Sequence, residues 1–198
     1  IVHTLKAFQQ AQSIDSIAVV CRKTDISDIK RLSSENGITK LTAVAEGGST
    51  RQQSVKNGVA LAQGADFIAI HDGARPLVTP QDIDKVVADA QKHGAAALGV
   101  QVKDTIKVVD NNGFILSTPN RSSLIAIYTP QVFKTDMYMQ AMKKAEEDNK
   151  DYTDDCQLVE ALGERVLVTV GSAENIKLTT PEDIAVAESF LKRRGNLE

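Results

Sequence analysis

An aspartate and an arginine follow one apolar segment at a spacing suited to a phosphorylated ligand. The segment 66–70 is predicted to be a buried strand, and His71, Asp72 and Arg75 come soon after it. In open α/β sheets, ligands bind beyond the carboxyl ends of the strands. There Asp72 offers an oxygen ligand for Mg²⁺, and Arg75 offers a bidentate donor for phosphate. The alternative is that Asp72 only caps a turn and pairs with Arg75, while His71 is expected to orient its neighbours rather than bind a ligand.

A lysine far along the chain is predicted to lie at the same edge of the sheet. Asn175-Ile176-Lys177 follows a strand predicted at 165–170 and precedes a helix that begins after Thr180. The carboxyl ends of parallel strands share one edge, so Lys177 is expected to point toward Asp72. An ordinary surface lysine is the competing interpretation. A carboxylate and cations gathered at one edge suggest chemistry on phosphates.

The sequence shows none of the usual arrangements that activate a nucleophile in enzymes. It contains no Ser-His-Asp spacing, no His-x-x-x-His pair and no activated cysteine. A phosphate monoester needs no activation, because its second pKa is about 6 and it is ionised at neutral pH. Catalysis would then consist of positioning and of charge neutralisation by magnesium, lysine and arginine.

Two glycines join a strand predicted at 41–45 to a helix predicted at 49–63. Gly47 and Gly48 would let a ligand approach the backbone, and the amino end of a helix attracts anionic groups. A tight turn with an ordinary helix cap is the competing interpretation, because the segment is neither a P-loop nor a G-x-G-x-x-G motif.

Segments 105–109 and 114–118 flank a turn of Asp, Asn and Gly and are predicted to form a projecting β-hairpin. An isolated hairpin is marginally stable in water, so we expect it to pack against a second subunit. Thr105 and Lys107 alternate onto one face, where a hydroxyl and an ammonium group could converge on a phosphate, or simply face solvent. Arg121 closes the hairpin and either reaches across a dimer interface or is exposed.

The other segments alternate between strands and helices, which is typical of a mostly parallel, doubly wound α/β sheet. The further strands are predicted at 14–21, 95–102 and 125–128. The further helices are predicted at 1–11, 24–35, 80–93, 135–147 and 153–162, and a final one begins after Thr180-Pro181. Thr153 is expected to be a plain N-cap of the helix at 153–162. We expect one domain over residues 1–198, with the hairpin arm at about 103–121.

Composition limits the classes of partner. A net charge of -3 over 198 residues gives no electrostatic footprint for nucleic acid. No apolar run approaches the roughly 18 residues of a membrane span. Cys21 and Cys156 form no disulfide framework and no metal spacing, so we expect structural thiols in a reducing compartment. The expected setting is the cytoplasm, without a nucleic-acid or membrane partner.

Taken in order, several short segments resemble the 2-C-methyl-D-erythritol 4-phosphate cytidylyltransferase family of the non-mevalonate isoprenoid pathway. The resemblance covers nearly the whole chain, and the joint order and spacing of the segments make it specific. It implies a Rossmann-like nucleotidyltransferase sheet and a homodimer in which a β-arm clasps the second subunit. The segments are Gly47-Gly48-x-x-Arg51-x-x-Ser54-Val55, His71-Asp72-Gly73-Ala74-Arg75-Pro76, Asp104-Thr105-Ile106-Lys107, Arg121, Thr129-Pro130-Gln131, Thr153-Asp154 and Asn175-Ile176-Lys177-x-Thr179-x-Pro181-Glu182-Asp183.

The resemblance also implies an activity, the transfer of a cytidylyl group from CTP to 2-C-methyl-D-erythritol 4-phosphate with release of pyrophosphate. Asp72 would bind Mg²⁺ and orient the methylerythritol phosphate, and Lys177 would neutralise the α-phosphate under in-line attack. The resemblance assigns Gly48, Ser49 and Ser54 to the cytosine and ribose of CTP.

On the side of the sugar alcohol phosphate, the resemblance implies that Arg75 supports the Asp72 loop. It implies that Thr105, Arg121 and Thr129 grip the substrate phosphate, with Arg121 supplied by the partner's arm. Thr153 would contact the polyol.

The family begins with a strand and a glycine-rich loop that carries an arginine and a lysine for the triphosphate. The sequence starts after that point, and turnover of CTP is expected to require the segment. Three alternatives stay open: a ribitol-5-phosphate cytidylyltransferase, a sugar-nucleotide binding domain without turnover, and a structural α/β domain whose charged loops are only caps.

Overall fold

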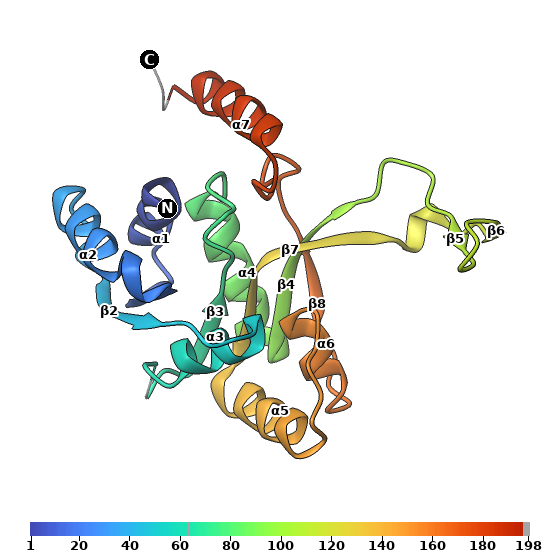
Figure 1. Ribbon diagram of the computed structural model, residues 1–198, viewed down its shortest axis with the longest axis horizontal. Helices are drawn as coiled ribbons and strands as arrows, with labels where there is room; N and C mark the ends of the chain where they lie inside the picture. Colours follow the sequence, from blue (N-terminus) through green and yellow to red (C-terminus); the bar gives the residue numbers. More distant parts are fainter. Residues whose placement is uncertain (63, 196–198) are drawn as a thin grey trace.

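Two sheets with helices packed on their faces form the body of the molecule (Figure 1). The computed structural model describes residues 1–62 and 64–195. The larger sheet has the order β3-β7-β4-β8, built from β3 (Phe67–Ile70), β7 (Ile125–Lys134), β4 (Ala95–Gln101) and β8 (Leu167–Val170). Strands β3, β4 and β8 run in one direction and β7 runs against them. The expected α/β class with a mostly parallel sheet is confirmed, with β7 as the exception.

Strand β7 is longer than the 125–128 predicted from the sequence. It continues through Pro130 to Lys134, although a proline cannot donate a hydrogen bond to the ladder. The pairing of β7 with β4 slips between Ala97 and Gly99, opposite this proline. This irregularity removes the need for a hydrogen bond at Pro130, so the strand can continue.

The smaller sheet pairs β1 (Ile17–Cys21) with β2 (Leu41–Glu46) in parallel. A turn of 3-10 helix, Lys23–Asp25, and α2 (Ile26–Glu35) connect the two strands. A cleft of about 680 Å³ lies between this sheet and β3, lined by residues of β1, β3, α1 and α3.

The two faces of the larger sheet carry separate apolar cores. Helix α4 (Pro80–His93) covers one face together with α1 (Val2–Gln10), and Thr79 caps α4 as predicted by accepting from the Asp82 amide. Helices α5 (Thr135–Glu147) and α6 (Asp155–Glu160) cover the other face. Ala96 of β4 faces α4 while Ala97 faces α5, as the alternation of side chains along a strand requires.

Three helix starts differ from prediction by two residues, and the first is α2, which begins at Ile26 rather than at Thr24. Helix α3 spans Arg51–Val59, and its N-cap is Thr50, which accepts from the Gln53 amide. The helix ends at Val59, before the predicted end at Gln63, which itself lies outside the described residues. Helix α6 is capped by Asp154 rather than Thr153, because the carboxylate accepts from the Gln157 amide. The last helix, α7, spans Pro181–Arg193.

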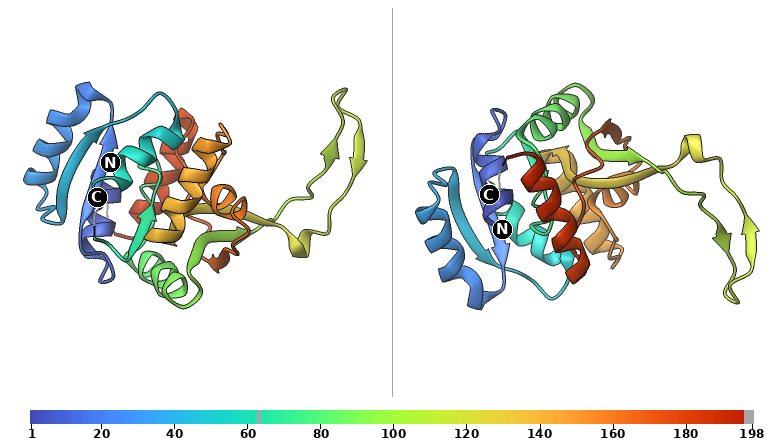
Figure 2. Two further views of the ribbon diagram at one scale, coloured as in Figure 1. Left: turned by 90° about the horizontal axis from the view of Figure 1, so that it is seen from below. Right: turned by 90° about the horizontal axis from the view of Figure 1, so that it is seen from above.

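The predicted arm is present. Strands β5 (Val108–Val109) and β6 (Ile115–Ser117) pair in antiparallel orientation, shorter than expected, and extend away from the body (Figures 1 and 2). Apolar side chains of the arm face outward, and Phe114 is 72% exposed. None of the helices within residues 1–62 and 64–195 is both long and apolar enough to cross a membrane.

Candidate active site

Three cations surround the carboxylate of Asp72 at the end of β3. Lys177 Nζ lies 3.0 Å from Asp72 Oδ2, Arg75 Nε lies 3.7 Å from the same oxygen, and Arg51 lies 3.7 Å from Oδ1. The prediction that Asp72 and Lys177 lie at one edge of the sheet is confirmed.

The loop after β8 carries Lys177 back across the sheet, because β8 and β3 are opposite edge strands. Its anchor is Asn175, which is 1% exposed and donates from Nδ2 to the carbonyl of Thr129 at 2.9 Å. Arg75 donates to the carbonyl of Asn175 at 2.8 Å, and the Leu178 amide donates to Ala74. The Lys177 loop and the Asp72 loop are therefore one hydrogen-bonded unit.

His71 and Thr129 brace the turn that presents Asp72. The Asp72 amide donates to Thr129 Oγ1 at 3.1 Å, and this hydroxyl lies 3.0 Å from His71 Nδ1. His71 Nε2 lies 3.2 Å from the carbonyl of Arg75, which can only accept, so Nε2 carries the proton and Nδ1 accepts from Thr129. Burial lowers the pKa of His71 to about 4. His71 is thus a neutral orienting residue, as the sequence suggested.

Asp72 is held ionised by its neighbours. Burial by itself would raise the pKa of this carboxyl group, but the hydrogen bond and charge of Lys177, with Arg51 and Arg75, outweigh burial and hold the pKa below its usual value. Arg75 is 9% exposed, and its guanidinium lies over the Tyr128 ring at 4.5 Å. Burial lowers the pKa of Arg75. These surroundings indicate that Arg75 supports the Asp72 loop rather than binding a phosphate directly.

Thr129, predicted to grip a substrate phosphate, lies beneath the Asp72 turn. It is 4% exposed, and its hydroxyl is occupied by Asp72 and His71. This geometry favours an indirect role, in which Thr129 positions Asp72 and Asp72 contacts the substrate.

The glycine turn packs tightly on α3. A Cβ atom on Gly48 would lie 2.4 Å from Gln53 Cβ, and one on Gly47 would lie 2.9 Å from Ser54 Oγ. The Gly48 amide donates to Ser54 Oγ, and Ser49 donates to the side chain of Gln53. Gly48 cannot be replaced without moving α3, whereas a side chain at Gly47 would displace the Ser54 hydroxyl. Ser54 reaches the same cleft as Asp72.

Sequence reasoning gave no role to Arg51 or to the acid that binds it. Arg51 donates to Asp155 Oδ2 at 2.7 Å across 104 residues of sequence. The charge of Asp155 outweighs the effect of burial and raises the pKa of Arg51. One signal was available: a cation in the first turn of a helix opposes the helix dipole and indicates a compensating acid nearby.

The arm residues lie apart from this cluster within one chain. Lys107 donates to Thr118, and Arg121 donates to the carbonyl of Lys103. Thr105 is exposed. In the described part of the chain, none of these three side chains contacts Asp72 or its cations.

Thr153 lies beside a second, smaller hollow of about 300 Å³ near the start of α6. Thr153 is exposed and bonds to Gln157. Asp154 and Ile127 line the same hollow.

Asp72 suits a metal that is shared with a phosphorylated ligand. Residues 1–62 and 64–195 contain no group of three His, Cys, Asp or Glu side chains that could hold a metal by themselves. Mg²⁺ in nucleotide sites is commonly held by one or two carboxylates plus phosphate oxygens. The single carboxylate, with side-chain exposure of 17%, fits that arrangement.

Comparisons with known proteins agree on one family. A family model described as 2-C-methyl-D-erythritol 4-phosphate cytidylyltransferase matches residues 1–193. Proteins of that name from Desulforamulus reducens and Clostridium novyi are 44% and 42% identical over 195 and 191 residues, covering 98% and 96% of this chain and 83% of each relative.

Solved structures give the same result. The crystal structure of 4-diphosphocytidyl-2C-methyl-D-erythritol synthase from Anaerococcus prevotii has a TM-score of 0.89 at 32% identity, covering 96% of this chain and 85% of that chain. The Thermus thermophilus 2-C-methyl-D-erythritol 4-phosphate cytidylyltransferase has a TM-score of 0.80 at 30% identity, covering 96% and 87%.

Proposed function

This chain belongs to the 2-C-methyl-D-erythritol 4-phosphate cytidylyltransferase family, and from that premise we propose how its site works. The protein transfers a cytidylyl group from CTP to 2-C-methyl-D-erythritol 4-phosphate, giving 4-diphosphocytidyl-2-C-methyl-D-erythritol and pyrophosphate. The observation that carries the assignment of the site is the 3.0 Å contact between Lys177 and Asp72.

Lys177 is the cation that meets the α-phosphate of CTP. Its side chain is 44% exposed while Asp72 holds it in place, so the ammonium group can exchange a carboxylate oxygen for a phosphate oxygen. The attacking phosphate of the sugar alcohol is ionised at neutral pH and needs no base. Positive charge fixed before attack lowers the barrier, because it need not reorganise as charge develops.

Asp72 orients the sugar alcohol phosphate and would be the protein ligand of Mg²⁺. When bound, the ion would supply positive charge that neutralises phosphate. The braces from Thr129 and Arg75 fix Asp72 for both tasks.

The nucleotide and polyol ends fit the two hollows. Gly48, Ser49 and Ser54 hold the cytosine and ribose end, since Ser54 lines the larger cleft and bonds to the Gly48 amide. Thr153 contacts the polyol from the smaller hollow.

The arm completes the site of a second subunit in a homodimer. Thr105, Lys107 and Arg121 bind the substrate phosphate of the partner, which accounts for cationic side chains on an arm that lies apart from its own Asp72. The exposed apolar side chains of the arm support this proposal, because such side chains are stabilised by burial in an interface. We place the protein in the cytoplasm, with small-molecule substrates and no nucleic-acid partner, in line with its net charge of -3.

A substrate panel tests the assignment. Full-length protein is incubated with CTP, with or without Mg²⁺, and with either 2-C-methyl-D-erythritol 4-phosphate or ribitol 5-phosphate. We expect pyrophosphate release only with methylerythritol phosphate and only with Mg²⁺. Release with ribitol phosphate alone would overturn the substrate, and CTP binding without release in any mixture would indicate a binding domain.

A further inference from the structure

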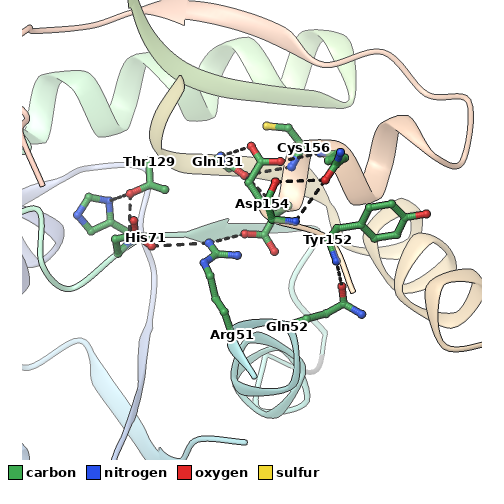
Figure 3. A network of polar contacts seen from close by, with 12 residues as sticks. Arg51, Gln52, His71, Thr129, Gln131, Tyr152, Asp154 and Cys156 are labelled. Carbon is green, nitrogen blue, oxygen red and sulfur yellow. Dashed lines mark hydrogen bonds and ion pairs between the residues drawn. The ribbon is translucent and has the colours of Figure 1, made fainter. Parts of the chain in front are cut away.

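Arg51 stands between two carboxylates at unequal distances. Its guanidinium is 2.7 Å from Asp155 Oδ2 but 3.7 Å from Asp72 Oδ1. Figure 3 shows Arg51 rising from α3, with dashed lines on both sides of its guanidinium. The first distance is a charge-assisted hydrogen bond, whereas the second exceeds hydrogen-bond length. Asp155 therefore holds the arginine away from the carboxylate of the site.

Asp155 is fixed firmly enough to do so. It is 3% exposed, and its Oδ1 accepts from the buried Tyr138 hydroxyl at 2.7 Å. Gln131 Oε1 accepts from the Asp155 and Cys156 amides, while Gln131 Nε2 donates to Asp154. These contacts leave Asp155 in one position at the start of α6.

The start of α3, which carries Arg51, is also joined to the segment before α6 by the next residue, Gln52. Gln52 Nε2 donates to the carbonyl of Lys150, and Gln52 Oε1 accepts from the Tyr152 amide. Figure 3 shows Gln52 and Tyr152 joined beside Arg51. Two adjacent side chains, Arg51 and Gln52, thus hold the amino end of α3 against this region. These contacts fix the backbone position from which the Arg51 side chain extends.

We propose that Asp155 is a positioning residue for the reaction, which holds Arg51 off Asp72 so that Oδ1 of Asp72 stays open to ligand. Arg51 then contributes positive charge beside Asp72 without closing on it. This inference rests on the proposed function in one respect, the use of Asp72 by substrate or Mg²⁺. It predicts that loss of the Asp155 charge lets Arg51 pair directly with Asp72 and mask it.

The test uses Asp155→Asn, Arg51→Gln and the double variant in the full-length protein. A new charge-assisted hydrogen bond from Arg51 must break before ligand binds, so kcat/KM of D155N should fall about ten- to hundredfold. The double variant should be more active than D155N, because no arginine remains to mask Asp72. Equal or lower activity of the double variant, or normal activity of D155N, would overturn the proposal. Asp89→Asn, which removes the charge from the acceptor of a 2.7 Å hydrogen bond from Thr169 outside the site, is the control for a lost acid.

A second readout does not depend on turnover. The carboxyl ¹³C signal of Asp72, assigned by its absence in Asp72→Asn, is titrated in each variant. The pKa of Asp72 should fall in D155N and rise in R51Q relative to wild type, and an unchanged pKa in D155N would refute the masking even if the substrate assignment failed. If D155N does not fold, R51Q alone carries the test: Arg51 lies beside Asp72 without closing on it, so its loss should raise the pKa of Asp72, and an unchanged pKa would overturn the proposal.

Discussion

Replacing Lys177 with methionine separates the catalytic role of this residue from its structural one. Its ammonium group is 3.0 Å from Asp72, but the side chain is 44% exposed, so solvent screens the pair. Exposed pairs contribute about 1 kcal/mol or less to stability, which is a fall in Tm of about 2–4 °C for a chain of this size. A preorganised group that stabilises transition-state charge is worth more, about 10²–10³ in kcat or 2.7–4 kcal/mol.

The assay is pyrophosphate release at saturating methylerythritol phosphate, with a thermal melt on the same sample. We expect kcat of Lys177→Met to fall by about two to three orders of magnitude with a small change in KM for CTP, since the contact strengthens in the transition state. Lys56→Met is the control, because Lys56 is 53% exposed and pairs with Glu146 away from Asp72. A kcat close to wild type, or a loss that tracks unfolding, would refute the reasoning.

Three further predictions concern the braces, the glycine turn and the arm. The unfolded chain takes up a proton at His71 near pH 6.5 and the folded chain only near 4, so stability is full above pH 6.5 and is lost as the pH falls. From pH 7 to pH 5 this loss is about 2 kcal/mol by linkage, and urea unfolding of His71→Gln should show less pH dependence. Gly48→Ala should raise KM for CTP, because the new Cβ would lie 2.4 Å from Gln53 Cβ; an unchanged KM would remove this turn from the nucleotide site. Mixing inactive Arg121→Ala and Asp72→Asn subunits should restore about a quarter of wild-type activity, since random hybrids carry one intact shared site. No recovery in subunits that demonstrably exchange would place Arg121 in its own chain's site.

The sequence was informative where local rules apply. Thr79-Pro80 begins α4 because the cap and the fixed proline geometry act within one turn. Asp72 was found because a charged residue directly after a buried strand lies at the ligand-binding edge. The arm was found because its Asp, Asn and Gly turn separates two β-prone segments.

Contacts between distant segments could not be predicted in the same way. The pair of Arg51 and Asp155 joins residues 104 apart, and only the docking of α3 beside α6 brings them together. Lys177 reaches Asp72 because buried Asn175 fixes a loop that crosses from the opposite edge strand. The role of Thr129 depended on its burial, which the polar character of threonine did not indicate.

The central claim is that Lys177, steadied by Asp72, neutralises the α-phosphate. A crystal structure of the full-length protein with methylerythritol phosphate, Mg²⁺ and a non-hydrolysable α,β-methylene analogue of CTP tests it most directly. The account predicts Lys177 Nζ within hydrogen-bond distance of an α-phosphate oxygen, with Asp72 beside the sugar alcohol phosphate or the ion. A complex in which the α-phosphate binds elsewhere, while Lys177 stays paired with Asp72, would contradict it.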